Sequence, residues 1–312
     1  MEPIFAFGAA EIPSFAKRNY WENPDGPRRR NILKIMRINY LALCIIALSA
    51  GAFLASRELA LMPDERLHVY FFDVGQGDGA LIVTPSGKQI VIDGGPAGGA
   101  MLRELAERMP FFDRTIDMLI LSHPQLDHIF AFPEILRRYR VGRILMTGIR
   151  NDLPRYDEFL RLIKEQRIPI WIADPKKDID LGDGIAIDVV WPEPALFGKK
   201  MKDVNNSSIM LRVINGTGAA VLFSGDAEEK EELAALASGA DLSAAVLKAG
   251  HHGSKTSSGT GFLIAAHPSL AVISAGKNNQ FGHPHAAVLN RMKALGIPIR
   301  VTGSEGTIEV AR

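Results

Sequence analysis

The sequence has a single cysteine, Cys44, among 312 residues. One thiol excludes both an intrachain disulfide framework and a zinc site built from several thiolates. An excess of charge of one sign is also lacking, because 36 Lys and Arg residues balance 35 Asp and Glu residues. The formal net charge of +1 gives no overall electrostatic argument for a nucleic-acid partner, so any such contact must be local.

Long apolar runs are scarce, and residues 38–55 form the one that could cross a bilayer. The first charges after this run are Arg57 and Glu58, whereas basic residues are dense before it. The positive-inside rule therefore predicts a cytoplasmic N-terminus and an extracytoplasmic domain in a single-pass protein of the cell membrane. The basic residues before the run are Lys17, Arg18, Arg28, Arg29, Arg30, Lys34 and Arg37.

Two other interpretations of this run stay open. Ala50, Gly51 and Ala52 resemble the small-residue cleavage site of a signal peptide, although the basic region before the run is long for one. A buried core helix is the other, and the basic flank argues against it. We predict an irregular, basic cytoplasmic tail over residues 1–37, a membrane anchor over 38–56, a linker over 57–66 and a folded domain over 67–312.

The folded domain has the pattern of an α/β protein. Short apolar segments typical of strands, such as 67–72 and 89–92, alternate with amphipathic patterns typical of helices, such as 101–109 and 156–166. Many strands with helices between them predict a layered α/β domain.

The most informative motif is SHPQLDH, residues 122–128, which directly follows the apolar run 118–121. This pattern is typical of a buried strand that leads into a loop at the edge of the core. The loop carries His123, Asp127 and His128, whose nitrogen and oxygen atoms suit zinc and other divalent metals. Alone, the motif is only suggestive, because a histidine pair after a strand is often a capped, solvated turn.

Two later segments repeat the arrangement. Residues 222–226 end in Asp226, and residues 246–254 contain His251 and His252 after an apolar start. Protein cores exclude ionisable groups unless these are paired or bound to metal. Three strand ends that each carry such groups therefore predict one shared metal site.

The order of motifs resembles the hydrolase domain of the ComEC competence family within the metallo-β-lactamase superfamily, over about residues 67–312. The motifs that carry the resemblance, besides the three above, are DVGQGD at 73–78, IDGG at 92–95, NNSS at 205–208 and GHPH at 282–285. The resemblance implies a four-layer αββα sandwich of the metallo-β-lactamase type, here preceded by one transmembrane helix.

The resemblance also implies one or two divalent metal ions, with zinc as the first choice and manganese as the second. Asp226 is expected to bridge two ions, and His252 could instead orient His251. Gln125 departs from the pattern, since relatives carry His or Asp there and an amide oxygen is a weak ligand. A mononuclear or weakly dinuclear site is therefore expected. The implied ligands are His123, Gln125, Asp127, His128, Asp226, His251 and His252.

Further roles follow from the same resemblance. Asp127 and His283 are expected to take part in catalysis, with His283 as an acid or hydrogen-bond donor. The residues expected either to orient the metal-binding histidines or to hold turns are Asp73, Asp78 and Asp93. Those expected either to contact phosphate oxygens or to serve turns are Asn206, Ser208, Lys255 and Ser257.

These expectations combine into a membrane-anchored, metal-dependent hydrolase. The expected substrate is DNA or another phosphodiester, and the expected partners are the bilayer around residues 38–55 and a separate DNA-uptake channel protein. Two alternatives are kept. One is a phosphoester hydrolase for cell-envelope or small-molecule substrates, and the other is a metal-poor binding module, which Gln125 makes conceivable.

Overall fold

The computed structural model describes residues 27–216, 218 and 220–312. It divides into two compact units, Met1–Leu59 and Ala60–Arg312. In the first unit the helix α1 runs over Pro27–Ala60. Residues 27–37 are thus helical where an irregular tail was predicted, because arginine, lysine, leucine and methionine are good helix formers and Pro27 suits a first helical position. The part of the predicted tail over residues 1–26 lies outside the described residues.

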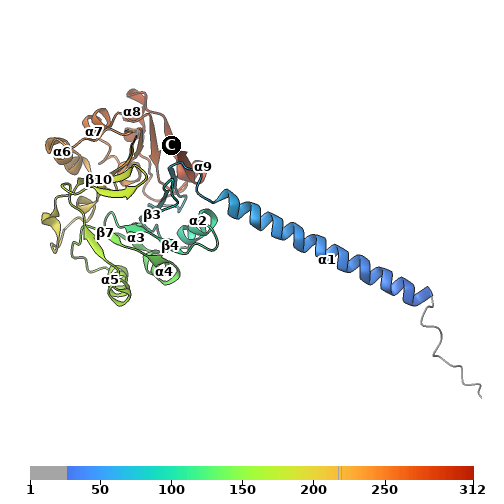
Figure 1. Ribbon diagram of the computed structural model, residues 1–312. Coiled ribbons are helices and arrows are strands. Elements are labelled where there is room, and N and C mark those ends of the chain that lie inside the picture. The colour runs from blue at the N-terminus through green and yellow to red at the C-terminus, as the bar shows by residue number, and fades with distance from the viewer. Residues whose placement is uncertain (1–26, 217, 219) are drawn as a thin grey trace, which may run out of the picture. The chain divides into compact units, whose positions relative to one another are not determined.

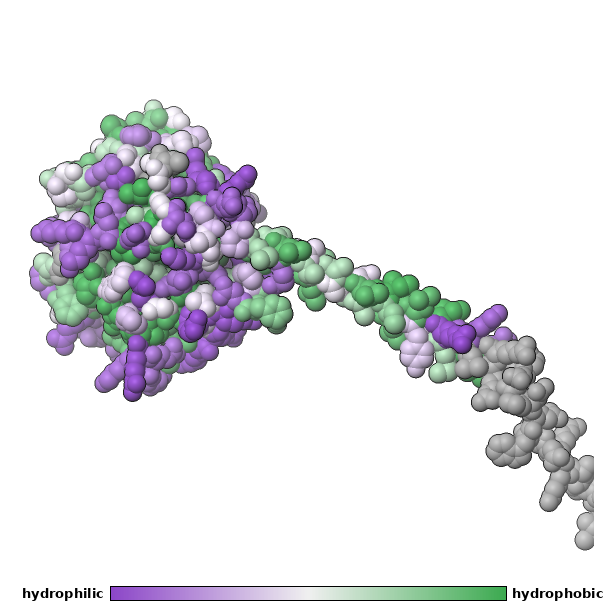
Figure 2. Space-filling model, viewed as in Figure 1, coloured by the Kyte–Doolittle hydropathy of each residue, from purple (hydrophilic) through white to green (hydrophobic). Residues whose placement is uncertain are grey.

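Helix α1 contains one segment, Lys34–Ala60, that is long and apolar enough to cross a membrane. At a rise of 1.5 Å per residue it extends about 40 Å, which exceeds the roughly 30 Å hydrocarbon core of a bilayer. Its apolar side chains are exposed in the structure, and Figure 2 shows hydrophobic surface along most of α1. The predicted N-terminal helix capable of spanning a membrane is confirmed.

The second unit contains two seven-stranded sheets and a small two-stranded sheet. The first sheet, in spatial order, consists of β16 (Ile308–Ala311), β1 (His68–Phe71), β2 (Ala80–Val83), β3 (Gln89–Ile92), β5 (Met118–Ile120), β7 (Ile144–Met146) and β8 (Ile170–Ile172). The second consists of β15 (Ile299–Val301), β14 (Leu270–Ile273), β13 (Val246–Lys248), β12 (Ala220–Phe223), β11 (Met210–Asn215), β10 (Ile185–Trp191) and β9 (Ile179–Gly182). The small sheet pairs β4 (Thr115–Ile116) with β6 (Arg140–Val141).

Helices cover the outer face of each large sheet (Figure 1). Those associated with the first sheet are α2 (Ala100–Arg108), α3 (Leu126–Ile129), α4 (Phe132–Arg138) and α5 (Pro154–Gln166). Those associated with the second are α6 (Glu229–Ala237), α7 (Thr260–Ala266) and α8 (Ala286–Ala294), while the short α9 (Thr302–Glu305) follows β15.

Alternation along the strands builds three hydrophobic clusters from these layers. Val69 and Phe71 of β1 belong to the cluster between the two sheets, where Phe71 stacks on Phe223 of β12. Phe72 points the other way, into the cluster beneath α2 that also holds Leu105. The third cluster lies between the second sheet and its helices and includes Phe262. Two sheets packed face to face, each covered by helices, confirm the predicted four-layer αββα sandwich.

Parallel pairing decides where polar side chains gather. In the first sheet β3, β5, β7 and β8 run parallel, and in the second β12, β13, β14 and β15 do. The loops after β3, β5, β12 and β13 carry the motifs with aspartate and histidine. Ligands of open α/β sheets bind outside the carboxyl ends of the strands, which is where these loops lie.

Candidate metal site

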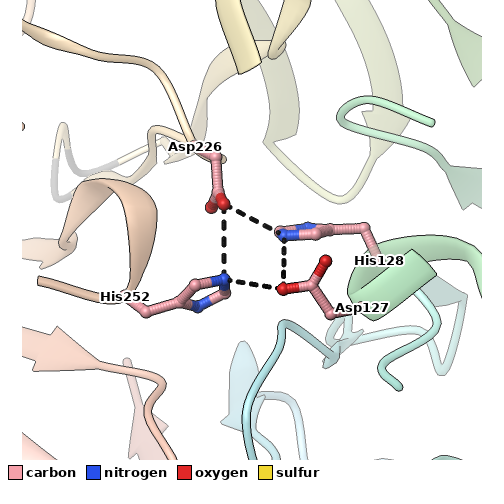
Figure 3. A group of neighbouring side chains, drawn as sticks. All are labelled: Asp127, His128, Asp226 and His252. Carbon is pink, nitrogen blue, oxygen red and sulfur yellow. Dashed lines mark ion pairs between the residues drawn. The ribbon is translucent and has the colours of Figure 1, made fainter. Parts of the chain in front are cut away.

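Four side chains from three strand-end loops meet at the carboxyl ends of the two sheets (Figure 3). Asp127 and His128 come from the short helix α3 after β5, Asp226 from the loop after β12, and His252 from the turn after β13. One ligand atom from each lies within 4.8 Å of all the others. His252 Nε2 is 3.2 Å from Asp127 Oδ2 and 3.3 Å from Asp226 Oδ2, and His128 Nε2 is 3.3 Å from Asp226 Oδ2.

These four residues fit a divalent metal ion. His128, Asp226 and His252 are buried, and their facing atoms, His128 Nε2, His252 Nε2 and both carboxylate oxygens of Asp226, make no hydrogen bond within the described chain. Buried polar atoms without hydrogen bonds are costly unless a ligand satisfies them. Two imidazole nitrogens and two carboxylates form a ligand set that zinc, manganese and iron accept.

The two histidines of the cluster hold their protons more strongly than a free imidazole does. Burial lowers the pKa of His128, but the charges of Asp226, Asp127 and Asp93 outweigh burial and raise the pKa well above its usual value. For His252, burial is likewise outweighed by Asp226 and Asp78, and the pKa is raised well above its usual value. Burial raises the pKa of Asp226, but His252 and His128 hold it well below its usual range. A metal ion must displace these protons, so metal affinity should fall as the pH falls.

Hydrogen bonds on the far side of each imidazole aim its Nε2 at the cluster. His128 donates from Nδ1 to Asp93 Oδ2 (2.9 Å), and Asp93 also accepts from the backbone and hydroxyl of Ser122 (2.8 and 2.7 Å). His252 donates from Nδ1 to the carbonyl of Ser274 (2.9 Å). A proton fixed on Nδ1 leaves the Nε2 lone pair free for a metal. Asp93 thus occupies an orienting position, which is one of the two roles that the sequence left open.

Asp78 stands beneath the cluster and is held by a buried lysine. Its Oδ1 is 3.2 Å from His252 Nδ1, and its Oδ2 forms an ion pair with Lys248 of β13. Lys248 is 2% exposed and Asp78 6%. The neighbouring Gly77 lies so close to the backbone of Asp127 that a Cβ there would be 2.4 Å from its carbonyl oxygen. The DVGQGD loop therefore packs directly against the metal-binding helix α3.

Asp73, by contrast, serves its own turn. Its Oδ1 accepts from the backbone of Gly75 (3.3 Å), and its backbone donates to the hydroxyl of Thr307 (3.0 Å). These contacts fit the turn role that the sequence left open.

His123 and Gln125 pair with each other beside the four-residue cluster. His123 Nε2 donates to Gln125 Oε1 at 3.0 Å, and the ring of His123 lies 4.2 Å from that of His128. Among the described residues, His123 belongs to no group of three or more His, Asp, Glu or Cys side chains that lie close enough together to hold a metal ion. A second metal-sized group, Asp78, Asp93 and His128, shares His128, but its carboxylates are already paired with Lys248 and Ser122. The geometry therefore favours one metal position, formed by Asp127, His128, Asp226 and His252.

His251 lies next to the cluster. Its Nε2 is 3.8 Å from Asp226 Oδ2 and its Nδ1 is 3.3 Å from Glu228 Oε1. Both His251 and His252 adopt left-handed backbone conformations, with φ of 46° and 53°. The sharp turn is what brings two consecutive imidazoles to the same side, where an extended strand would point them to opposite faces.

The residues predicted to contact phosphate differ in their exposure to solvent. Ser208 and Ser257 are fully buried, and Ser208 Oγ accepts from the backbone of Asp226 while Ser257 Oγ donates to the carbonyl of Gly250. These contacts are those of turn residues. Lys255 is exposed after the histidine turn, and Asn206 lies in the short helix Asn205–Ser207.

Three of the four metal-binding residues, Asp127, Asp226 and His252, line an open cleft of about 720 Å³, and His128 is buried behind them. His283 lines it, and Gln76 Nε2 donates to His283 Nδ1 at 3.4 Å, which leaves Nε2 as the donor of that ring. Burial and the neighbouring His252, His285 and His251 lower the pKa of His283 to about 4, so the ring is neutral at pH 7. Apolar side chains form much of the rest of the wall, and they are Pro96, Ala97, Pro124, Leu126, Phe130, Leu153, Val204 and Phe281.

Three residues near the site were not singled out from the sequence. Phe281, 54% exposed, stacks on His283 with ring centroids 5.8 Å apart. Ser122 connects Asp93 to the metal-binding histidines, and Lys248 neutralises Asp78. Lys248 could have been identified from the sequence, because a lysine at the end of an apolar strand directly before the histidine pair is unusual.

The fold agrees with the comparisons with known proteins. The family model of the metallo-beta-lactamase superfamily matches residues 72–277, and the chain belongs to this superfamily. The chain is also similar to two competence proteins, which confirms the predicted resemblance to the ComEC family. Competence protein ComA of Neisseria gonorrhoeae is 34% identical over 85% of this chain and 35% of its own length. ComE operon protein 3 of Bacillus subtilis is 31% identical over 77% of this chain and 32% of its own length. The chain thus spans about a third of these relatives.

A solved structure shares the fold. The metallo-beta-lactamase fold protein YhfI of Bacillus subtilis superposes with a TM-score of 0.51 at 12% identity, over 77% of this chain and 99% of that one. At this identity the likeness concerns the fold alone.

Proposed function

We propose that this chain is a membrane-anchored, metal-dependent hydrolase of phosphodiesters, with DNA as the expected substrate. The observation that carries the proposal is the convergence of Asp127, His128, Asp226 and His252 at an open cleft, which Asp127, Asp226 and His252 line. Superfamily membership and the similarity to competence proteins support it.

The chain's own residues would divide the work as follows. Asp127, His128, Asp226 and His252 hold one divalent ion, zinc or manganese, while Asp93 fixes the His128 tautomer. When bound, such an ion polarises a phosphoryl oxygen and lowers the pKa of water. His283 donates a hydrogen bond from Nε2 to the substrate, and the apolar wall around Phe281 contacts its organic part.

The cell-envelope or small-molecule phosphoester stays as the second candidate substrate. The cleft lining, within the described chain, includes no lysine or arginine. Proteins that follow a nucleic-acid backbone place basic residues along it. A cleft without them suits a substrate with a single phosphodiester equally well.

The proposed orientation has the N-terminus in the cytoplasm and the hydrolase unit outside, since the basic residues precede the apolar segment. A protease added to intact cells should then digest the chain after Arg57. Protection until lysis would contradict the orientation. A role in DNA uptake beside a separate channel protein is part of the proposal and follows only from the similarity to competence proteins.

The deciding experiment measures metal content and turnover of the purified full chain. Manganese- or zinc-loaded protein should hydrolyse a nitrophenyl phosphodiester and a labelled single-stranded oligonucleotide, and Asp226→Asn should abolish both activities and most of the bound metal. Turnover of the small ester without binding or cleavage of DNA at low salt would select the second candidate. A wild-type chain that binds no divalent ion at micromolar concentration would favour the binding module.

A further inference from the structure

The chain enters the first sheet at the end that is opposite to the metal site. β1 begins at His68, which pairs with Val83 at the end of β2, and Val83 pairs with Gln89 at the start of β3. Since β3 and β5 run parallel, their amino ends share this edge, whereas Asp93 and His123 follow their carboxyl ends. The metal site and the connector from α1 are therefore separated by the length of the strands.

An exposed aromatic loop lies at the connector's end of the sheet. Phe111 and Phe112, between α2 and β4, are 61% and 86% exposed and meet edge to face at 5.2 Å. Gln89 Nε2 donates to Asp113 Oδ2 at 2.6 Å, which fastens this loop to the start of β3. Two positions before Gln89, Gly87 contacts the connector so closely that a Cβ there would lie 2.6 Å from Pro63 Cγ. Loop and connector thus flank the same strand start.

An arginine lies against Phe111, and two more exposed arginines lie on or next to the adjacent small sheet. The guanidinium of Arg114 lies 5.4 Å from the ring centre of Phe111. Arg140 pairs with Thr115 across the small sheet, and Arg114, Arg138 and Arg140 are all exposed. Exposed phenylalanines next to arginines suit the boundary between headgroups and acyl chains of an anionic bilayer.

We propose that Phe111, Phe112, Arg114, Arg138 and Arg140 form a membrane-docking surface, which rests on the bilayer that holds α1. This inference depends on the proposed membrane anchor. The connector between Ala60 and Leu67 reaches at most about 25 Å when fully extended, so the hydrolase unit stays at the bilayer surface. The surface that lies at the connector's end of the sheet is the one that meets the lipid. Docking in this way turns the metal-binding cleft toward the aqueous side.

Because Cys44 is the chain's single cysteine, the docking surface can be tested with site-specific labels. In a Cys44→Ser background of the full chain, Phe112→Cys would carry an environment-sensitive fluorophore, in vesicles of phosphatidylcholine and phosphatidylglycerol. The matched control is Phe197→Cys, 63% exposed and packed near Gly148, which follows the carboxyl end of β7. We expect blue-shifted emission and quenching by nitroxide-labelled lipid at position 112, and neither effect at position 197.

The outcomes separate the inference from the anchor on which it depends. A chain that fails to float with vesicles overturns the anchor and the docking surface together. A chain that floats while its label at position 112 stays as water-exposed as the label at 197 overturns the docking surface alone. A blue shift that follows protein concentration and ignores lipid quenchers identifies self-association and also overturns lipid docking. Quenching that weakens when phosphatidylglycerol is omitted supports the role of the arginines.

Discussion

His123 donates a hydrogen bond from Nε2 to the side-chain oxygen of Gln125 at 3.0 Å. The nitrogen that would bind a second metal ion is thereby protonated and directed at a neutral amide. A metal ion at His123 would have to displace this hydrogen bond and would gain only a weak amide oxygen as its other ligand. The pair is therefore consistent with a single metal position.

The first prediction concerns metal stoichiometry. Wild-type protein should bind one divalent ion per chain, and Gln125→His or Gln125→Asp should raise the number toward two, because each supplies a stronger ligand beside His123. Gln125→Ala, which removes the amide without adding a ligand, is the control. Elemental analysis after dialysis measures the result, and two ions in the wild type would contradict it.

The second prediction concerns Asp93, which fixes the tautomer of His128. Asp93→Asn keeps a residue that tolerates the left-handed backbone at this position (φ 58°) but weakens the acceptor for His128 Nδ1. Metal affinity should fall about 10- to 100-fold. Competition with a chromogenic chelator measures it. The control is Asp73→Asn, because Asp73 makes a turn contact. This change should leave the metal affinity unaltered.

The third prediction concerns the buried ion pair of Lys248 and Asp78. Lys248→Met would leave the buried Asp78 carboxylate without its lysine partner and should lower the free energy of unfolding by about 3–5 kcal/mol. Denaturant titration with a chelator present excludes any contribution from metal. Adding Asp78→Asn should recover part of the loss, and Lys255→Met, at the exposed lysine nearby, should change stability by less than about 0.5 kcal/mol. An equal effect at both lysines would contradict the ion pair's role.

The fourth prediction tests the cleft wall. If a base stacks on Phe281, Phe281→Ala should raise KM for an oligonucleotide about 5- to 150-fold, the range expected for loss of one stacking contact. Phe281→Tyr should restore it. KM for a small phosphodiester should change much less. Phe112→Ala, at the opposite end of the strands, controls for the loss of an exposed phenylalanine, and a similar KM change there would refute a specific stacking role.

The fifth prediction concerns pH and the connector. His68 Nε2 faces Asp64 Oδ1 at 2.8 Å and its Nδ1 faces Glu309 Oε1 at 2.7 Å, so only the imidazolium donates to both. Burial lowers the pKa of His68, but Asp64 and Glu309 outweigh burial and raise it. The stabilisation is thus fully present below the unfolded pKa of about 6.5 and is lost as the pH rises through the higher folded value.

Unfolding measured from pH 5 to 9 should show His68→Gln destabilising at low pH and nearly neutral at high pH. In a variant that also carries Asp64→Asn and Glu309→Gln, His68→Gln should lose this pH dependence. A pH dependence that survives there would assign it to other groups.

Patterns in the sequence predicted the fold where they were strong and local. The apolar runs before His123, Asp226 and His251 gave β5, β12 and β13, and motif order implied the sandwich. The four-residue helix α3 and the small helix α7 were not predicted, since a few residues cannot display a helical period. The helical start of α1 was missed because its charges resemble a tail.

The residues of the candidate site were predictable from the sequence, but the role of each residue was less so. Motifs identified Asp127, His128, Asp226 and His252, yet sequence cannot tell that His123 turns to Gln125 or that Ser208 is buried beneath Asp226. Those outcomes depend on contacts between segments far apart in the chain. Phe281 was not predicted for the same reason, since it lies beside His283 only in the folded loop.

The turn at His251 and His252 has a consequence for any attempt to stabilise this protein. Two consecutive non-glycine residues in left-handed conformations cost roughly 1–2 kcal/mol each, which the rest of the fold must offset. Glycine at either position would relieve that strain and remove an imidazole. Selection for thermostability alone would therefore favour glycine at these two positions. Variants selected in this way would need to be screened for metal binding at the same time.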